Sequence, residues 1–330
     1  MTDDYLTETV THAEAGKGIR KDASFDLVEI PEPFGPVTFT IDQDKLRTFA
    51  FAVDDYSSWY FKDSPFGGPI GHPILMANDL LFLFYENYDG NTAEGLQSHE
   101  RLTFHSPARV GETITVSGAY TEKFENRGHG YVVLDAEARG EDGRVIIKHH
   151  GTEIMRTRAG EVGGASKPSE VTRRVSAHID ESLPVATMAK AGLPAGTGVP
   201  GITRRFHQDQ LNSFSWLARG YRNVHTDIDS ARKSKVGRTF VQALQQTELI
   251  AEAMVQFFGA SWFTSGELDL RYTHPAFTGD ELTVSAAVVS DDGETQELEV
   301  WIDTDTGIRT ALGWARARID PSTERPHQLL

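Results

Sequence analysis

The sequence predicts an α+β protein made of two similar halves, each an antiparallel sheet wrapped around one long buried helix. Three observations lead to this prediction: two sequence blocks recur half a chain apart, each copy contains one long apolar run, and several strand-like segments follow that run. With 330 residues, of which 39% are hydrophobic and 24% charged, the chain is long enough for about two domains with substantial cores.

The two halves are recognisable because both blocks recur in the same order. Residues 43–49 (QDKLRTF) align with residues 208–214 (QDQLNSF), which lie 165 positions later. Residues 107–117 align with residues 275–285, at an offset of 168. Two blocks with nearly the same offset indicate a tandem duplication, so each copy is expected to fold as one unit.

The duplication predicts an N-terminal half over residues 1–156, a linker over 157–200 and a C-terminal half over 201–330. The linker is rich in Gly and Pro and has little hydrophobic periodicity. Within it, residues 196–201 (GTGVPG) formally match the phosphate-binding pattern GxGxxG, but they contain Pro and are not followed by a helix-like segment. We therefore interpret them as linker.

Each copy is predicted to contain a short amphipathic helix, a polar loop, a long apolar helix and then a run of strands. The short helices are expected to begin after Asp44 and Asp209 as N-caps. The long helices are His72–Tyr85, which is hydrophobic on nearly every face, and Ala243–Phe258, with Gly259 as its C-cap. The predicted strands are Thr113–Thr121, Tyr131–Arg139, Val145–Met155, Glu281–Ser290, Gln296–Thr304 and Arg309–Ile319.

The composition argues against several classes of protein. The 48 acidic and 32 basic residues give a net charge of −16, which would repel nucleic acid and anionic membranes. No export signal and no apolar stretch of about 18 residues is found. Without cysteine there is no disulfide or thiolate zinc site, and the histidines show no metal-site spacing. We expect a cytoplasmic protein without a metal that binds neither nucleic acid nor membrane.

The loop YRNVHTD, which starts at Tyr221 and is followed by Ala231 and Gly237, resembles a signature of the MaoC-like family of (R)-specific enoyl-CoA hydratases and hydroxyacyl-thioester dehydratases. That signature is D-x-N-P-[I/L]-H-x-D-x-x-x-A, followed by a G-x-P-I-x-H-G helix start. The resemblance covers most of residues 36–156 and 202–319. It implies a tandem, or double, hot-dog fold and a hydro-lyase that needs no cofactor.

The resemblance implies acid/base chemistry on an α,β-unsaturated or 3-hydroxy acyl thioester of CoA or acyl-carrier protein. In the family, an Asp and a His five residues later share the proton transfers. His225 occupies the histidine position and Asp227 the following acidic position, while Gly220 replaces the aspartate. Asn223 is a candidate to orient water or a ligand carbonyl, and Asp227 is also a good helix cap.

In the N-terminal half the replacement is reversed, because Asp55 occupies the aspartate position and Tyr60 the histidine position. These two residues are expected to be relics or part of a second site. The family also uses backbone N–H groups at the start of the long helix as an oxyanion hole. Pro73 aligns there in the first copy and has no N–H, whereas Ala243 in the second copy can donate. We therefore expect the site in the C-terminal half, around His225, Ala243 and Gln242.

Four cations lie close to the His225 loop in this acidic chain, namely Arg232, Lys233, Lys235 and Arg238. Coenzyme A carries a 3′-phosphate and a diphosphate, so a cationic rim is what it would require. A solvated helix end would have the same composition, and the sequence favours neither interpretation.

Two alternative functions are consistent with the same residues. A hot-dog thioesterase would need a carboxylate near the long helix, for which Glu248 is the candidate. A non-catalytic double hot-dog protein would bind an acyl ligand or pair with a catalytic partner, and the missing aspartate at Gly220 favours it. Because the chain supplies both halves of a hot-dog pair, it is expected to be a monomer or a homodimer of the double unit.

Overall fold

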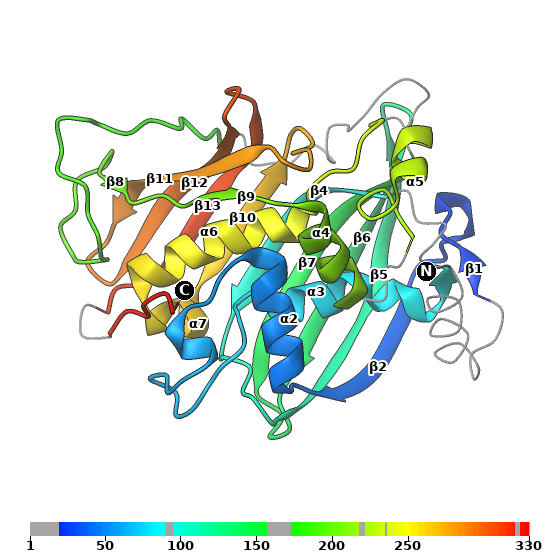
Figure 1. Ribbon diagram of the computed structural model, residues 1–330, viewed down its shortest axis with the longest axis horizontal. Coiled ribbons are helices and arrows are strands. Elements are labelled where there is room, and N and C mark those ends of the chain that lie inside the picture. The colour runs from blue at the N-terminus through cyan, green and yellow to red at the C-terminus, as the bar shows by residue number, and fades with distance from the viewer. Residues whose placement is uncertain are drawn as a thin grey trace.

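The two halves of the chain join into one 11-stranded antiparallel sheet with the helices on one face (Figure 1). The computed structural model describes residues 20–89, 95–156, 173–217, 222–234, 236–320 and 324–329. The strand order is β2-β5-β6-β7-β4 in the N-terminal half, followed directly by β10-β13-β12-β11 and β8 in the C-terminal half, while β9 pairs with β11. The same order of pairing is thus repeated, outward from the centre, in both halves.

All six predicted strands are present, as β5, β6, β7, β11, β12 and β13, with ends within about five residues of the predicted ones. The strands are β2 (Glu32–Thr40), β4 (Leu96–Phe104), β5 (Thr113–Asn126), β6 (His129–Arg139), β7 (Val145–Arg156), β8 (Gly198–Val199), β9 (Thr203–Arg205), β10 (Glu267–Tyr272), β11 (Glu281–Asp291), β12 (Thr295–Thr304) and β13 (Arg309–Arg318). A separate small pair consists of β1 (Lys21–Asp22) and β3 (Tyr88–Asp89). Strands β2, β4 and β10 were not among the predicted strands.

The halves meet where β4 pairs antiparallel with β10, so that Leu270 lies opposite Glu100. Across this seam the Asp269 carboxylate accepts hydrogen bonds from His99 Nε2 at 2.7 Å and from Arg101 Nε at 2.8 Å. The seam therefore combines backbone pairing with charged cross-strand contacts, and no gap in the sheet separates the repeats.

Helix α6 (Ala243–Phe258) is the centre of the C-terminal half and has the predicted bounds, with Gly259 as its C-cap. Nearly all of its residues are buried, including polar ones such as Thr247, Glu248 and Glu252, which find partners inside the protein. Its counterpart is shorter than predicted: α3 covers Leu75–Leu81 and continues as the 3-10 helix η3 (Phe82–Glu86). The apolar run at 72–85 has no polar face, so tertiary packing rather than periodicity sets where the α-helical geometry stops.

The short helices α2 (Gln43–Val53) and α4 (Gln208–Leu217), which correspond in the repeat, pack against each other. The predicted N-cap Asp44 is wrong, because it lies in the first turn of α2. The cap is Asp42, whose side chain accepts a hydrogen bond from the Lys45 N–H at 2.7 Å. Likewise Asp209 lies in the first turn of α4. The remaining helical elements are η1 (Phe25–Leu27), η2 (Ser58–Tyr60), α5 (Ile228–Lys233) and α7 (Ala260–Ser265).

The described part of the predicted linker, residues 173–200, is tied to the C-terminal sheet. The Glu299 carboxylate accepts hydrogen bonds from the Ser176 and Ala177 N–H groups, and Arg173 forms an ion pair with Glu297. The GTGVPG segment supplies β8 and opens no helix. Residues 157–172 lie outside the described residues. Within the part of the chain that the structure describes, no helix is long and apolar enough to cross a membrane.

We expect the seam to be a main source of stability. Leu270, in the middle of β10, is 0% exposed, so Leu270→Ala should lower the free energy of unfolding by about 2–5 kcal/mol through lost burial and the cavity left behind. Urea denaturation measures this loss. The matched control is Leu27→Ala at a side chain that is 46% exposed, where a change within about 0.5 kcal/mol is expected. Equal losses at both positions would contradict the seam's role.

Candidate active site

The loop that carries His225 is organised by Asn223. The Asn223 Oδ1 atom accepts hydrogen bonds from the backbone N–H groups of His225 at 2.9 Å and Thr226 at 3.2 Å, which is the geometry of an Asx turn. At the other side, Gln208 Nε2 donates to the His225 carbonyl oxygen at 2.7 Å and ties the loop to α4. The Asn223 side chain, which the sequence made a candidate to orient water or a ligand carbonyl, therefore uses its Oδ1 atom to shape the loop.

The His225 ring is held in one tautomer. Its Nδ1 atom lies 2.7 Å from the Phe240 carbonyl oxygen, which can only accept, so Nδ1 carries the proton. The ring also packs edge-to-face on the Phe240 side chain, with centroids 4.4 Å apart. Burial lowers the pKa of His225 to about 4, opposed in part by the bond to Phe240. At neutral pH the ring is uncharged, and Nε2 has its lone pair available for a proton.

The start of α6 lies three residues beyond Phe240. Gln242 precedes the helix as N-cap, and its Nε2 donates to Ser215 Oγ at 2.5 Å while its backbone N–H donates to Gln245 Oε1 at 3.2 Å. Ala243 is the first helical residue, so its N–H belongs to the first turn, whose donors have no intrahelical acceptor. The positive end of the helix dipole favours an oxyanion at this position.

Asp227 is the N-cap of α5. Its Oδ1 atom accepts the Ser230 backbone N–H at 2.7 Å, and this hydrogen bond lowers the pKa of Asp227. The carboxylate is therefore a structural acceptor at neutral pH rather than a proton donor, which agrees with the capping alternative that the sequence left open.

The cations near this loop lie on α5 and the turn after it. Arg232 and Lys233 are exposed, and Arg232 lies 3.7 Å from Asp229 one turn earlier. The Arg238 guanidinium stacks over the Phe277 ring, 4.5 Å from its centroid. The fourth predicted cation, Lys235, lies outside the described residues. Gly220, at the position of the family aspartate, also lies outside them.

The corresponding place in the N-terminal half is closed. Asp55 is fully buried, and its Oδ1 atom accepts hydrogen bonds from Ser57 Oγ at 2.6 Å and from Gln328 Nε2 at 3.0 Å. Tyr60 is also fully buried and stacks on His72 with ring centroids 3.7 Å apart. His72 Nε2 in turn lies 2.9 Å from the Asp55 carbonyl oxygen.

A carboxyl group from the other half covers the start of α3. Pro73 has no N–H, and the next backbone donor, Ile74, is hydrogen-bonded to Glu248 Oε2 at 3.1 Å. Glu248 is on α6 and was the sequence's candidate for a thioesterase carboxylate. It points into the N-terminal half, where the Ile74 N–H is therefore already bonded and cannot donate to a thioester oxygen.

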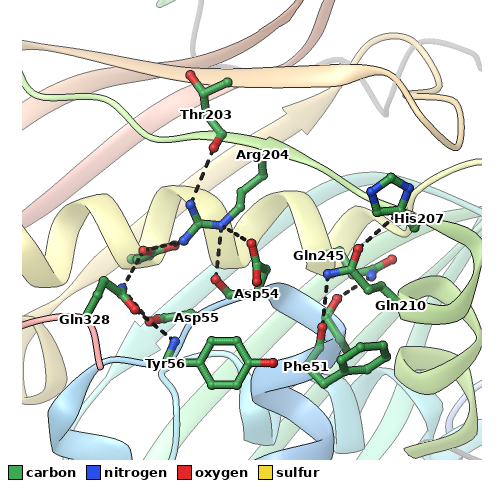
Figure 2. Close-up of polar contacts among 12 residues, drawn as sticks. Phe51, Asp54, Asp55, Tyr56, Thr203, Arg204, His207, Gln210, Gln245 and Gln328 are labelled. Atoms are coloured by element: carbon green, nitrogen blue, oxygen red, sulfur yellow. Dashed lines mark hydrogen bonds and ion pairs between the residues drawn. The ribbon is translucent and has the colours of Figure 1, made fainter. Parts of the chain in front are cut away.

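Three acidic side chains gather at this point, from α6 and from the loop after α2. Burial raises the pKa values of Glu248 and Glu252, and the neighbouring Asp55 raises both further. Arg204 partly compensates, because its guanidinium donates to both Glu252 oxygens at 3.0 and 3.2 Å. Burial, followed by the same carboxylates, raises the pKa of Tyr60. Figure 2 shows Arg204 between the Asp54 loop and α6.

Sequence reasoning missed a second buried polar network, which begins one turn into α6. Thr247 Oγ1 donates toward the Ala243 carbonyl at 3.2 Å and lies 2.5 Å from the Tyr272 hydroxyl, which donates to Glu100 Oε2 at 2.6 Å. His149 Nε2 lies 3.2 Å from the other Glu100 oxygen. The spacing of Thr247, four residues after Ala243, places it on the same helix face, but its partners on β4, β7 and β10 depend on the seam.

Comparisons with known proteins agree with this architecture. Residues 29–149 match the family model "FAS1-like, dehydratase domain region". A solved MaoC-like dehydratase superposes with a TM-score of 0.70 at 15% identity, covering 90% of this chain and 100% of that one. A MaoC-like dehydratase from Phytophthora capsici gives a TM-score of 0.61 at 15% identity, covering 88% and 97%. No curated protein sequence matches.

The double hot-dog arrangement also occurs in a conserved hypothetical protein of Mycobacterium tuberculosis, at 14% identity and a TM-score of 0.61, covering 90% of this chain and 98% of that one. The chain thus has the double hot-dog fold. Together with the family match in the N-terminal half, this confirms the resemblance to MaoC-like dehydratases that the sequence indicates.

The buried carboxyl cluster makes stability depend on pH. Because the folded-state pKa of Glu248 is raised, the folded protein holds a proton that the unfolded chain loses near its ordinary pKa. The contribution of Glu248 to stability is therefore full at low pH and is lost as pH rises toward its folded-state pKa. The neutral variant Glu248→Gln, which can still accept from Ile74, should be more stable than the wild type at pH 8, by on the order of 1 kcal/mol.

Urea denaturation at pH 5 and pH 8 tests this expectation. The matched control is Glu141→Gln, at an exposed position, which should leave the pH dependence unchanged. A wild-type protein whose stability rises between these two pH values relative to Glu248→Gln would show that Glu248 is ionised and stabilising in the fold.

Proposed function

We propose that the protein is a hydro-lyase that adds water to an α,β-unsaturated acyl thioester, or removes it from a 3-hydroxyacyl thioester, at the start of α6. The observation that supports this most directly is the His225 ring, whose proton is held on Nδ1 by the Phe240 carbonyl, so that Nε2 is a base. The dehydratase-type fold is consistent with this chemistry. The contrast between the halves also supports it, since the N-terminal helix start is covered by Glu248.

In the hydration direction, His225 Nε2 takes a proton from water as its oxygen bonds to the β-carbon of the substrate. The electron pair of the double bond moves toward the thioester, whose oxygen becomes an enolate stabilised by the Ala243 N–H. The imidazolium then returns the proton to the α-carbon, and dehydration is the reverse. With a pKa of about 4, neutral His225 is a weaker base than an ordinary histidine, and its protonated form is a stronger acid. This favours transfer of the proton from the imidazolium to the α-carbon.

Three side chains near His225 take part in hydrogen bonds of the fold and have supporting roles in this proposal. Asn223 and Gln242 hold the loop and the helix start in place through their hydrogen bonds to His225 N–H and Ser215. Asp227 positions α5 and its cations. We therefore propose that the catalytic residues lie in the C-terminal half, at the start of α6. The start of α3 in the N-terminal half has another role.

One observation favours an alternative function, a non-catalytic protein that binds acyl thioesters. Gly220 stands at the position where the family has its aspartate. The thioesterase is disfavoured, since Glu248 is bonded to Ile74 and lies against Asp55 rather than beside His225. A panel of trans-2-enoyl-CoAs and 3-hydroxyacyl-CoAs distinguishes the three. Loss of enone absorbance without release of free thiol indicates a hydratase. Release of thiol indicates a thioesterase, and no change in either absorbance or thiol indicates a binding protein.

We expect His225→Ala to lower kcat by about 10²–10⁴-fold without unfolding the protein, because the proton acceptor is lost while the loop stays anchored by Asn223. Steady-state hydration kinetics and circular dichroism measure the two effects. The matched control is His274→Ala, at an exposed histidine in the loop after β10, for which unchanged kinetics are expected. The wild-type rate should be flat near neutrality and fall below about pH 5, as His225 becomes protonated. Turnover that survives in His225→Ala would overturn the assignment.

The cations of α5 give a separate expectation about the carrier. The double variant Arg232→Ala/Lys233→Ala should raise KM for a CoA thioester roughly tenfold, equivalent to about 1.4 kcal/mol, and leave kcat unchanged. The corresponding pantetheine thioester lacks the 3′-phosphate and diphosphate, so its KM should not change. Arg205→Ala, at an exposed arginine on β9, serves as the control. An equal effect on both substrates would mean that these cations do not contact the phosphates.

A further inference from the structure

The C-terminal segment of the chain, Glu324–Leu329, returns to the N-terminal half and pairs with the loop that follows α2. Ser58 N–H donates to the His327 carbonyl at 2.8 Å, and Leu329 N–H donates to the Tyr56 carbonyl at 3.1 Å. Ser57 and Gln328 form an antiparallel bridge between these two bonds. The segment thus docks as a short added strand, a mode in which backbone bonds hold a peptide and one side chain enters a pocket.

The side chain that enters is Gln328, and both ends of its carboxamide are recognised. Its Nε2 lies 3.0 Å from Asp55 Oδ1, from Ser57 Oγ and from Glu252 Oε1. Its Oε1 accepts the Tyr56 backbone N–H at 3.0 Å. Figure 2 shows Gln328 beside Asp55 and the backbone nitrogen of Tyr56. Three acceptors and one donor, contributed by both halves of the chain, surround this one amide.

Several buried polar atoms belong to residues that lie around Asp55. Asp55 Oδ2, His72 Nδ1, Glu248 Oε1 and the Tyr60 hydroxyl are inaccessible to solvent and have no well-aligned hydrogen-bond partner among the described residues. Each belongs to a side chain that is at most 2% exposed. Buried polar atoms in this state are costly unless a polar ligand or ordered water reaches them, so the place has the character of a binding pocket.

We propose that the surroundings of Asp55 are a second binding site, which recognises a primary carboxamide, and that Gln328 of the same chain is its resident ligand. The site is separate from His225 and makes the C-terminal segment a cover over the N-terminal half. An external molecule that presents a primary carboxamide, such as a glutamine or asparagine side chain of a peptide, enters when the segment lifts.

The arrangement of donors and acceptors selects this chemical class. A carboxylate in the place of the amide would put an anion against Asp55 and Glu252, which already crowd acidic groups into a buried space. An ammonium group would satisfy the three acceptors but leave the Tyr56 N–H without an acceptor. A primary carboxamide serves both sides of the site, because its two N–H donors are shared among the three acceptors and its carbonyl oxygen accepts from the Tyr56 N–H.

Chemical rescue in the full-length chain tests the proposal. Gln328→Ala keeps the backbone pairing but removes the carboxamide, so the Tm should fall and the amides of residues 56–58 should exchange faster with deuterium. Acetamide should then fill the vacated place, raise the Tm of Gln328→Ala in a saturable way and restore the slow exchange, because a ligand that binds the folded state stabilises it. Acetamide should leave the wild-type protein unchanged.

Two comparisons make the outcome decisive. Acetate and N,N-dimethylacetamide, which lack the N–H donors, should not rescue Gln328→Ala. Gln328→Glu, with the same length but a carboxylate, should release the segment and speed deuterium exchange at 56–58 more than Gln328→Ala does. An equal response of wild type and Gln328→Ala to acetamide, rescue by acetate, or exchange in Gln328→Glu as slow as in the wild type would each overturn the proposal.

Discussion

The pairing of β4 with β10 is the constraint on which the rest of the structure depends. It joins two sheets into one and thereby decides which side chains of one half can reach the other. Because α6 lies across this seam, Thr247 reaches the Tyr272–Glu100 pair, and Glu248 reaches the backbone of Ile74. The Thr247–Glu100 and Glu248–Ile74 contacts each join residues more than 100 positions apart, so both depend on how the two halves meet rather than on the linker.

The two halves have the same arrangement of helices and strands but different polar groups at the start of their long helices. In the N-terminal half the donor is already bonded to a carboxyl group, and the aligned aspartate, Asp55, is covered by Gln328. In the C-terminal half the histidine is fixed by a backbone carbonyl, and the Ala243 N–H lies in the first turn of α6, where no carboxyl group covers it as Glu248 covers Ile74. A duplication allows this divergence, because one copy can lose a function that the other keeps.

Much of the framework could be predicted from the sequence, whereas most of the site's contacts could not. Strands β5, β6, β7, β11, β12 and β13 consist of alternating hydrophobic and polar residues and are bounded by turns that contain Gly and Asp. Such a pattern is visible in the local sequence. Strand β4 (LQSHERLTF) was missed because His99 and Glu100 are buried through partners on other strands, which makes its sequence look polar. The position of His225 came from a motif, but its partner Phe240 follows from how the loop folds back, which no local pattern encodes.

The Glu248–Ile74 hydrogen bond has a consequence for the history of the chain. In the alignment of the two copies, the residue that corresponds to Glu248 is Asn78, so the contact has no mirror image. Two N-terminal halves placed together would present Asn78 at this point in place of a carboxyl group, so this hydrogen bond needs one copy of each half. The two halves are therefore not interchangeable at this contact, and their divergence since the duplication includes the surface by which they meet.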